Sequence, residues 1–222
     1  MCNLKSKIKF TAVTIAWTEG GTLGMSIKAS ANSEISIAWG NGRIIKHLFH
    51  TESYMNFVNH YSKRKIPLDG KRFNVEISAE NPYCSIIGFY MGGDMEIVDL
   101  DVSNCLELEE LNSYSYGNPL DLSRNVVLKY LNCADNGLTS LDLSNNTALE
   151  VINCSRNRLS HLSLTNNFCL KELNCECNEM ERLSIGYAPH LREAAFEVGN
   201  HIDEATKMQI RYIIAENTEN MD

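Results

Sequence analysis

The sequence has little proline and glycine, with 4 Pro and 13 Gly in 222 residues, so long disordered linkers are not expected. No apolar run approaches the roughly 18–20 residues that span a bilayer, and no membrane-spanning segment is expected. Basic residues are not in excess, since 28 Asp/Glu outnumber 20 Lys/Arg and give a net charge of −8. This balance argues against nucleic acid as a sequence-independent partner.

Motifs of catalysis and nucleotide binding are also missing. The sequence contains no GxSxG, HExxH, GxxxxGK[ST] or GxGxxG, so we assign no catalytic residue and expect no cofactor. Cys175 and Cys177 are too closely spaced for a CxxC metal knuckle. His47 and His50 would share a face on a helix but not on the strand predicted there, and His60 is the only other histidine nearby. No metal site is therefore expected.

Composition divides the chain into two halves. Residues 1–95 carry 11 Lys/Arg and 7 Asp/Glu, whereas residues 96–222 carry 9 and 21. Asparagine shifts at nearly the same place, since 14 of the 24 Asn lie between Asn104 and Asn178. With 44% hydrophobic residues the chain can build a core. Two differently built domains are expected.

The second half contains a repeat of 21 residues. Three segments align without gaps: LKYLNCADNGLTSLDLSNNTA (128–148), LEVINCSRNRLSHLSLTNNFC (149–169) and LKELNCECNEMERLSIGYAPH (170–190). One turn of chain is too short to bury its own apolar side chains, so stacked turns must share one interior. The period therefore predicts a solenoid.

Alternation within each repeat predicts one short parallel strand per turn, at 130–134, 151–155 and 172–176. The side chains expected inside are Leu131, Ile152, Leu173, Cys133, Cys154 and Cys175, and those expected outside on the first strand are Tyr130, Asn132 and Ala134. Thiols that point in parallel from one column rarely reach disulfide geometry, so these cysteines should be free.

Polar columns are expected at the turns. Asn136, Asn157 and Asn178 should turn the chain, with their amides bonded to neighbouring backbone groups. On the opposite side of each turn, side-chain turns are expected at Ser123, Ser144 and Thr165. Beside them, Asp101, Asp121 and Asp142 form a column that either attracts a cation or is simply solvated; we favour solvation, because Ser163 and Ser184 replace the acid further along.

Leu149, Ile152, Cys154, Asn157 and Leu159 match the pattern LxxLxLxxNxL, and the sets that begin at 128 and 170 do the same. Residues 96–199 resemble the leucine-rich repeat family. They are most similar to short repeats with LNC and LDLSxN segments in surface proteins of gut bacteria. The resemblance implies a secreted or cell-surface protein. No signal peptide is recognised in this chain, so a cytoplasmic location stays open.

The first half is predicted to be a β-sandwich. The strand-like runs are 7–15, 23–29, 34–39, 44–49, 72–78, 85–90 and 96–102, with glycine-rich turns between several of them. Phe73, Val75 and Ile77 should face the core. Residues 35–45, ISIAWGNGRII, resemble the WGDG hairpin of PKD-like domains, although Asn41 replaces Asp and argues against a metal role there. Residues 56–61 are predicted as a short helix or a long loop.

The predicted fold class is mainly β: a PKD-like sandwich (1–95), a short leucine-rich repeat solenoid (96–199), and a capping helix with a tail (200–222). Asp203 should N-cap a helix over 204–216. The apolar stripe expected to cover the last repeat consists of Ala205, Met208, Tyr212 and Ile213. A helix that binds a partner instead is the alternative.

The outward strand positions are the binding face that the resemblance implies. They are Glu110, Asn112, Tyr130, Asn132, Val151, Asn153, Glu172, Asn174 and Glu176. The column of amides offers donors and acceptors to a polypeptide or a glycan, but the amides can equally bond to one another along the stack. Five strands about 4.8 Å apart form a short face, so a partner would also have to touch the first domain.

We therefore expect a non-catalytic module that binds a protein or a glycan. One alternative is a carbohydrate-active or carbohydrate-binding accessory protein that uses the first domain, which the WGNG hairpin motivates. Another is a structural spacer without a ligand. The basic group Lys63, Arg64, Lys65, Lys71 and Arg72 either attracts anionic glycans or lipid headgroups or is a solvated loop, which we favour. Oligomeric state is left open.

Overall fold

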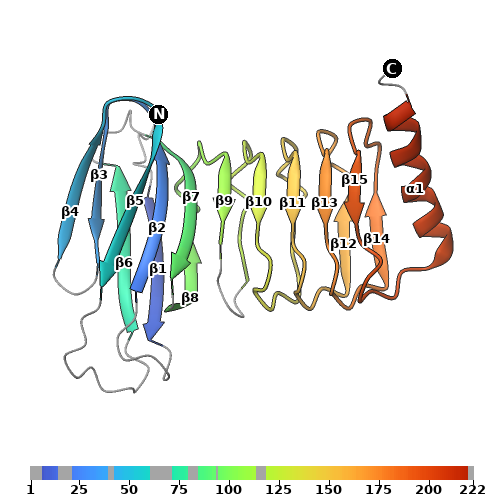
Figure 1. Cartoon of the computed structure of the whole chain (residues 1–222), viewed down its shortest axis with the longest axis horizontal. Helices are drawn as coiled ribbons and strands as arrows, with labels where there is room; N and C mark the ends of the chain where they lie inside the picture. The colour runs from blue at the N-terminus through green and yellow to red at the C-terminus, as the bar shows by residue number, and fades with distance from the viewer. Residues whose placement is uncertain are drawn as a thin grey trace. The chain divides into compact units, whose positions relative to one another are not determined.

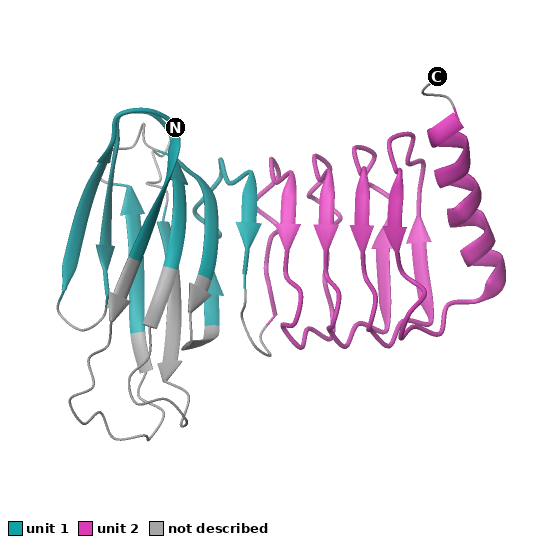
Figure 2. Cartoon of the chain, in the orientation of Figure 1, with its two compact units in different colours: residues 1–116 teal, residues 117–222 magenta. Residues whose placement is uncertain are grey.

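The computed structural model divides into two compact units, residues 1–116 and 117–222 (Figure 2). The structure describes residues 7–14, 22–39, 43–60, 72–79, 85–93, 95–113 and 119–219. Strands dominate both units, and one helix follows the strands of the second (Figure 1). The predicted fold class is confirmed. The domain limits given above, at 95/96 and 199/200, stay predictions.

One sheet of the first unit has five antiparallel strands in the order β4-β3-β6-β1-β8. They are β1 (Lys7–Thr14), β3 (Ser33–Ala38), β4 (Ile44–Phe49), β6 (Arg72–Ala79) and β8 (Met95–Asp101). Val75 and Ile77 of β6 are buried and Asn74 is exposed, as the alternation predicts. Ile35 and Ile37 of β3 are buried in the same way, so one face of this sheet is apolar.

The other layer of the first unit pairs its strands in the order β9-β7-β2-β5. They are β2 (Thr22–Ala29), β5 (Ser53–His60), β7 (Ile86–Gly93) and β9 (Glu110–Asn112). Ile27 and Phe89 are buried on this layer. Strand β9 is parallel to β7, whereas the other neighbours are antiparallel. The first unit thus contains one strand of the repeat type as well as the sandwich.

Strand β5 was not expected. A helix or a loop over 56–61 is wrong for residues 56–60, which belong to this strand. Strand β5 is the last in its layer and pairs on one side only, with β2. Residues 53–56 are all exposed, and Phe57 is the first buried side chain. An edge strand with this many exposed positions lacks the alternation by which a strand is recognised.

The second unit is a solenoid of stacked turns (Figure 1). One parallel sheet consists of β10 (Tyr130–Asn132), β11 (Val151–Asn153), β13 (Glu172–Asn174) and β15 (Glu193–Ala195). Its register pairs residues 21 positions apart, such as Leu131 with Ile152. A second parallel pair, β12 (His161–Leu164) and β14 (Arg182–Ile185), lies on another side of each turn. The predicted 21-residue coil is confirmed.

The inward columns also agree with prediction. Leu131, Ile152 and Leu173 are buried. Cys133, Cys154 and Cys175 are buried as well, and all three thiols are free. Burial raises the pKa of each of these thiols, and that of Cys154 rises to about 12. The cysteine column therefore behaves as a stack of small, neutral core side chains.

Buried asparagines connect successive turns, as predicted. Asn157 donates from Nδ2 to the carbonyl oxygens of Cys133 and Cys154, both at 2.9 Å, and its Oδ1 accepts from the N–H of Leu138 at 2.9 Å. Asn178 repeats the pattern one turn later. Each amide thus satisfies backbone groups of its own turn and of the turn before it.

The residue that turns the chain is not the asparagine itself. Asp135, Arg156 and Cys177, each one position earlier, have positive φ values of 59°, 56° and 53°. The strands accordingly end at residue 132 or its equivalents rather than at 134. Ala134, expected outside, is buried because the chain turns directly after it and its N–H donates to Oδ1 of Asn132 at 3.2 Å.

The asparagine ladder continues beyond the aligned repeats. Asn200 donates to the carbonyl oxygens of Cys175 and Phe196, at 2.9 and 2.8 Å, and accepts from the N–H of Met180 at 3.1 Å. The sequence places the end of the repeat at Gly199, whose φ is +70°. Asn200 was missed because the last turn is one residue longer than the period.

A second asparagine ladder was also missed. Asn125, Asn146 and Asn167 are buried on the other side of the turns. Asn146 donates to the carbonyl oxygens of Leu122 and Asn125, at 3.0 and 2.9 Å, and Asn167 donates one turn later in the same way. These bonds again join adjacent turns.

The outer turns are closed by aspartate rather than by serine side chains alone. The N–H of Ser144 donates to Oδ1 of Asp142 at 2.9 Å, and Ser123 donates to Asp121 at 3.0 Å. Hydrogen bonds from Ser144 lower the pKa of Asp142, and those from Ser123 lower the pKa of Asp121. Further along, the hydroxyl groups of Ser163 and Thr165 lie 3.3 Å apart. This aspartate column therefore has a structural role.

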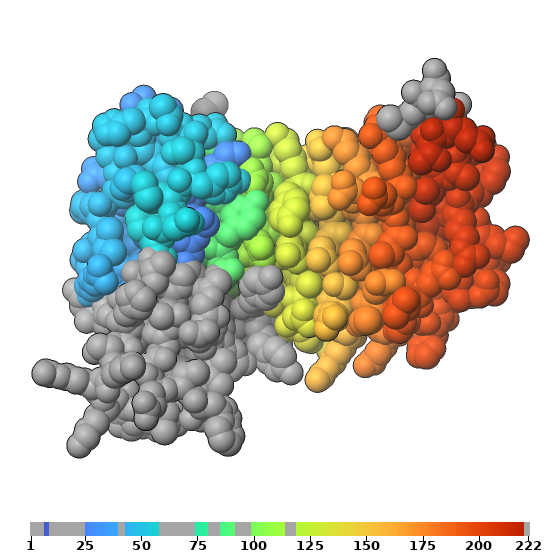
Figure 3. Space-filling view, in the orientation of Figure 1, coloured from blue at the N-terminus to red at the C-terminus, as the bar shows by residue number. Residues whose placement is uncertain are grey.

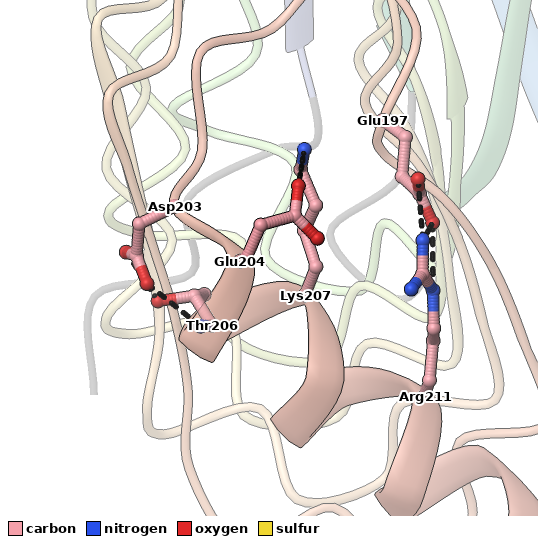
Figure 4. Close-up of polar contacts among 6 residues, drawn as sticks. All are labelled: Glu197, Asp203, Glu204, Thr206, Lys207 and Arg211. Carbon is pink, nitrogen blue, oxygen red and sulfur yellow. Dashed lines mark hydrogen bonds and ion pairs between the residues drawn. The ribbon is translucent and has the colours of Figure 1, made fainter.

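Helix α1 (Glu204–Glu219) begins as predicted. Oδ1 of Asp203 accepts a hydrogen bond from the N–H of Thr206 at 2.9 Å (Figure 4). Such an N-cap satisfies a backbone donor that the helix leaves unpaired. No helix in the described part of the chain combines the length and the apolar character needed to cross a membrane.

Of the four residues predicted for the packing face of α1, Ile213 is half-buried and the other three are exposed. Met208 and Tyr212 are each 62% exposed and Ala205 is exposed, whereas Ile210 is 2% exposed. The helix carries two stripes at helical spacing, and the one that packs includes Asn217, whose Nδ2 donates to carbonyl oxygens of the last turn at 2.8 and 2.9 Å. Those carbonyls need donors, and Asn217 supplies them from the stripe that packs.

Candidate functional site

The strand face of the second unit is hollowed into a groove of about 690 Å³, called the strand groove below. Its lining consists of Tyr130, Val151, Ile152, Asn153, Glu172, Leu173, Asn174, Arg192, Glu193, Ala194, Ala195 and Ile214. All but Ile214 come from the strands or the residues next to them; Ile214 comes from α1. Figure 3 shows the atoms of α1, in red, against those of the last turns, in orange. The helix therefore contributes to the groove.

The parallel register arranges the outward side chains in two rows. The first row is Tyr130, Val151, Glu172 and Glu193, and the second is Asn132, Asn153, Asn174 and Ala195. Adjacent members lie on strands about 4.8 Å apart, and the rows are two residues, or about 6.6 Å, apart. The first row changes from apolar to acidic along the stack, and the second changes from amide to methyl.

The three amides of the second row use their oxygens within their own turns. Oδ1 of Asn153 accepts from the N–H and the hydroxyl of Ser155, at 3.1 and 2.8 Å, and Oδ1 of Asn174 accepts from the N–H of Glu176 at 3.2 Å. Asn132 makes the equivalent bond to Ala134. No bond joins these amides along the stack in the described residues, where their Nδ2 donors have no partner.

Five of the nine residues predicted for the binding face line the strand groove: Tyr130, Val151, Asn153, Glu172 and Asn174. Asn132 and Glu176 belong to the same turns but not to the lining. Two further lining residues, Ile152 and Leu173, were predicted as interior side chains, and the residues not predicted for this face are Arg192, Glu193, Ala194, Ala195 and Ile214. Extending the 21-residue register by one turn would have found Glu193 and Ala195, whereas no signal in the sequence places Ile214 of the helix.

Glu110 and Asn112 lie on β9 in the first unit. The carboxylate of Glu110 is already bonded within the first unit. It forms an ion pair with Lys28 at 2.8 Å and accepts hydrogen bonds from the hydroxyls of Tyr54 and Tyr90. Burial opposes ionisation of Glu110, but these partners outweigh it and lower its pKa. Burial and the bond to Glu110 raise the pKa of Tyr54 to about 12.

Gly88 explains how these side chains meet on one face. It lies between Glu110 and Lys28 in the register of three strands. A Cβ there would lie 3.0 Å from Cβ of Lys28 and 3.5 Å from the ring of Tyr54. The missing side chain lets the ion pair cross β7, so Glu110 stabilises the pairing of β9.

The other polar candidates carry no site. His47 is half-buried, with its ring edge-on to Phe49 and Phe57 at 4.9 and 5.8 Å. Where the structure describes the chain, no three His, Cys, Asp or Glu residues are grouped to hold a metal. A hollow of about 180 Å³ beside Asp121 and Asp142 is lined by the aspartates that close the turns.

Some predictions fall outside the described residues. These are the turn of the WGNG hairpin at 40–42, the basic residues Lys63, Arg64, Lys65 and Lys71, and the side chains of His60, Arg72 and Phe73.

Comparison with known proteins adds little. No family model and no curated protein matches the chain. One solved structure is similar: the functional domain of InlJ from Listeria monocytogenes, described as including a cysteine ladder. It is 26% identical over 48% of this chain and 29% of that chain, with a TM-score of 0.43. At that score the likeness carries no argument, and the solenoid of 21-residue turns described above is shown by its own register and burial.

Proposed function

We propose that the second unit is a non-catalytic module that binds an extended polypeptide in the strand groove. The observation that carries the proposal is the pair of amides Asn153 and Asn174 in the groove lining. Their oxygens accept hydrogen bonds within their own turns, whereas their Nδ2 donors have no partner among the described residues. A donor that is fixed in position and partly shielded from water loses little freedom when it binds a carbonyl oxygen.

Polypeptide is the preferred ligand class because the lining comes from four adjacent strands, and an extended chain offers main-chain carbonyl oxygens at regular intervals to donors on such a surface. Sugar hydroxyl groups also accept hydrogen bonds, so a glycan is the competing ligand class. An enzyme is not proposed. Glu172 and Glu193 are the only neighbouring carboxylates of the lining, and both are exposed rather than held in the apolar surroundings that create a general acid.

The test removes the Nδ2 donors of the groove while keeping the side-chain hydrogen bonds that stabilise the turns. In Asn153→Asp with Asn174→Asp, each oxygen still accepts its backbone N–H but the Nδ2 donor is gone. The immobilised full chain is screened with displayed random linear peptides and with a glycan array. Peptides selected by the wild type should bind the variant about 30-fold more weakly, the effect of two lost hydrogen bonds.

The matched control is Asn145→Asp with Asn166→Asp, which makes the same chemical change on the opposite side of the turns, where both amides bond to carbonyl oxygens of Ser123 and Ser144. It should bind like the wild type. Equal losses in both variants, or selection of glycans and no peptides, would contradict the proposal.

A location at the bacterial surface and a PKD-like origin for the first unit are further proposals, supported by sequence resemblance alone. Fractionation of producing cells tests the first: recovery of the chain only from the cytoplasm would reject it.

A further inference from the structure

The last strand of the groove departs from the repeat. At the inward position, β15 has Ala194 where the other strands have Leu131, Ile152 and Leu173, and Ala194 is only half-buried. At the second outward position it has Ala195 in place of asparagine. A leucine and an asparagine are thus replaced by methyl groups at one end of the groove, and the space beside Ala194, Ala195 and Ile214 is called the hollow below.

Helix α1 closes this end. Ile214 lines the groove beside Ala194 and Ala195. The helix is fixed by the two-pronged ion pair of Arg211 with Glu197, at 2.6 and 2.7 Å, and by the amide of Asn217 (Figure 4 shows the ion pair). Because these contacts lie on both sides of Ile214 along the helix, they hold that side chain in place. The hollow is therefore preformed.

Acidic side chains border the hollow. Glu172 and Glu193 are opposite each other in the parallel register of β13 and β15. Both are exposed, and neither carboxylate has a hydrogen-bond or ion-pair partner among the described residues. Arg192 also reaches the lining but forms no ion pair with them within the same part of the chain. Like charges on adjacent strands are unfavourable, and a cation between them would relieve the repulsion.

We propose that this end of the strand groove selects peptides in which a lysine or arginine lies two positions from a large apolar residue. The basic side chain pairs with Glu172 and Glu193, and the apolar side chain fills the hollow between Ala195 and Ile214. Glu193 and Ala195 lie two residues apart on one face of β15, about 6.6 Å, which equals the separation of alternate side chains in an extended peptide. This inference rests on the proposed function and specifies its ligand.

The experiment compares the full-length wild type with two variants in selection from displayed random linear peptides. Glu172→Gln with Glu193→Gln removes both charges and keeps the shape. Its control, Glu179→Gln with Glu181→Gln, removes two exposed charges from the turn that carries Glu172, at positions outside the groove lining. The wild type and the control should both enrich the basic–apolar pair, and the test variant should lose the basic preference and bind the selected peptides about tenfold more weakly.

Ala195→Asn changes peptide affinity in opposite directions under the two interpretations of the hollow, as an apolar pocket or as a continuation of the amide column. The substitution restores the asparagine column of the repeat and fills part of the hollow. If the hollow takes an apolar side chain, Ala195→Asn loses the apolar preference and weakens binding; if the amide column continues there, it strengthens binding, and the inference is wrong. Enriched peptides without the basic–apolar pair would overturn the inference alone. Enrichment of no peptide at all would overturn the proposed function with it.

Discussion

In the first unit, backbone groups pair with the backbone of neighbouring antiparallel strands, whereas in the second unit buried asparagine side chains pair with much of the backbone that leaves the strands. A sandwich strand of six to eight residues forms backbone hydrogen bonds with its neighbouring strands along its length. In the solenoid, strands of three or four residues satisfy only a small part of the backbone, because most of each turn lies outside any strand. The stability of the second unit should therefore depend on a few polar side chains, and that of the first on apolar ones.

The largest expected effect is that of Asn157→Ala. It removes an amide that bonds backbone groups of two turns and leaves several of them buried and unpaired, at a cost of about 4 kcal/mol. Denaturation in urea measures the loss. Asn166→Ala, whose side chain is exposed and donates one bond of 3.3 Å, should change stability by less than about 0.5 kcal/mol. Similar losses of stability at Asn157 and Asn166 would contradict the conclusion that buried asparagines stabilise the second unit.

The first unit should respond most strongly to a change of volume. Ile77 is fully buried in the middle of its sheet and pairs with Ile8 and Ile37. Ile77→Ala should destabilise the first unit by about 3 kcal/mol through lost burial and a new cavity. Hydrogen exchange should show the loss of protection in β1, β3 and β6. If protection fell equally in β11 and β13, the two units would not respond separately.

The same contrast explains which parts of the molecule could be predicted. The solenoid was predicted because identical side chains recur at identical offsets, so that Leu131, Ile152 and Leu173 identify one another. The edge strand β5 was missed because most of its first half is exposed and has no alternation. The orientation of α1 was missed because Met208 and Tyr212 are more apolar than Asn217, while the last turn needs hydrogen-bond donors.

The candidate site was predicted only where the repeat extends. Tyr130, Asn153 and Glu172 follow from alternation within the aligned turns. Ala194 follows from extending the register by one turn, but its small side chain departs from the repeat. Ile214 does not follow at all, because it comes from the helix after the repeat. The end of the groove is formed where the repeat stops, and a repeat pattern carries no information about what closes it.

The cysteine column gives a smaller effect that depends on pH. Burial raises the pKa of Cys154 from 9.0 to about 12, which means that the fold favours the neutral thiol. This stabilisation is complete below about pH 9 and is lost as the pH rises toward 12, because the unfolded chain releases the proton first. The contribution of Cys154 to the free energy of unfolding should fall by about 1.4 kcal/mol per pH unit in that interval.

Cys154→Ala isolates this effect. The difference in unfolding free energy between the wild type and Cys154→Ala should shrink between about pH 10 and 11, whereas a difference that stays constant with pH would contradict it. Cys105, a buried thiol of the first unit with its pKa raised by burial to about 12, provides the matched comparison. Cys105→Ala should show the same trend, because burial and not the repeat is its cause.

The smallest effect is expected at the helix, where the two modes of stabilisation meet. Asn217 of α1 donates to the carbonyl oxygens of Ala188 and Leu191, which have no ladder asparagine in the next turn to bond them. Asn217→Ala should cost about 1 kcal/mol and increase hydrogen exchange throughout α1. Arg211→Ala, which breaks an exposed ion pair with Glu197, should have a smaller effect. If Arg211→Ala were the more damaging change, the helix would be held by its surface charges, and the ladder of Asn125, Asn146 and Asn167 would end at Asn167 rather than continue into the cap.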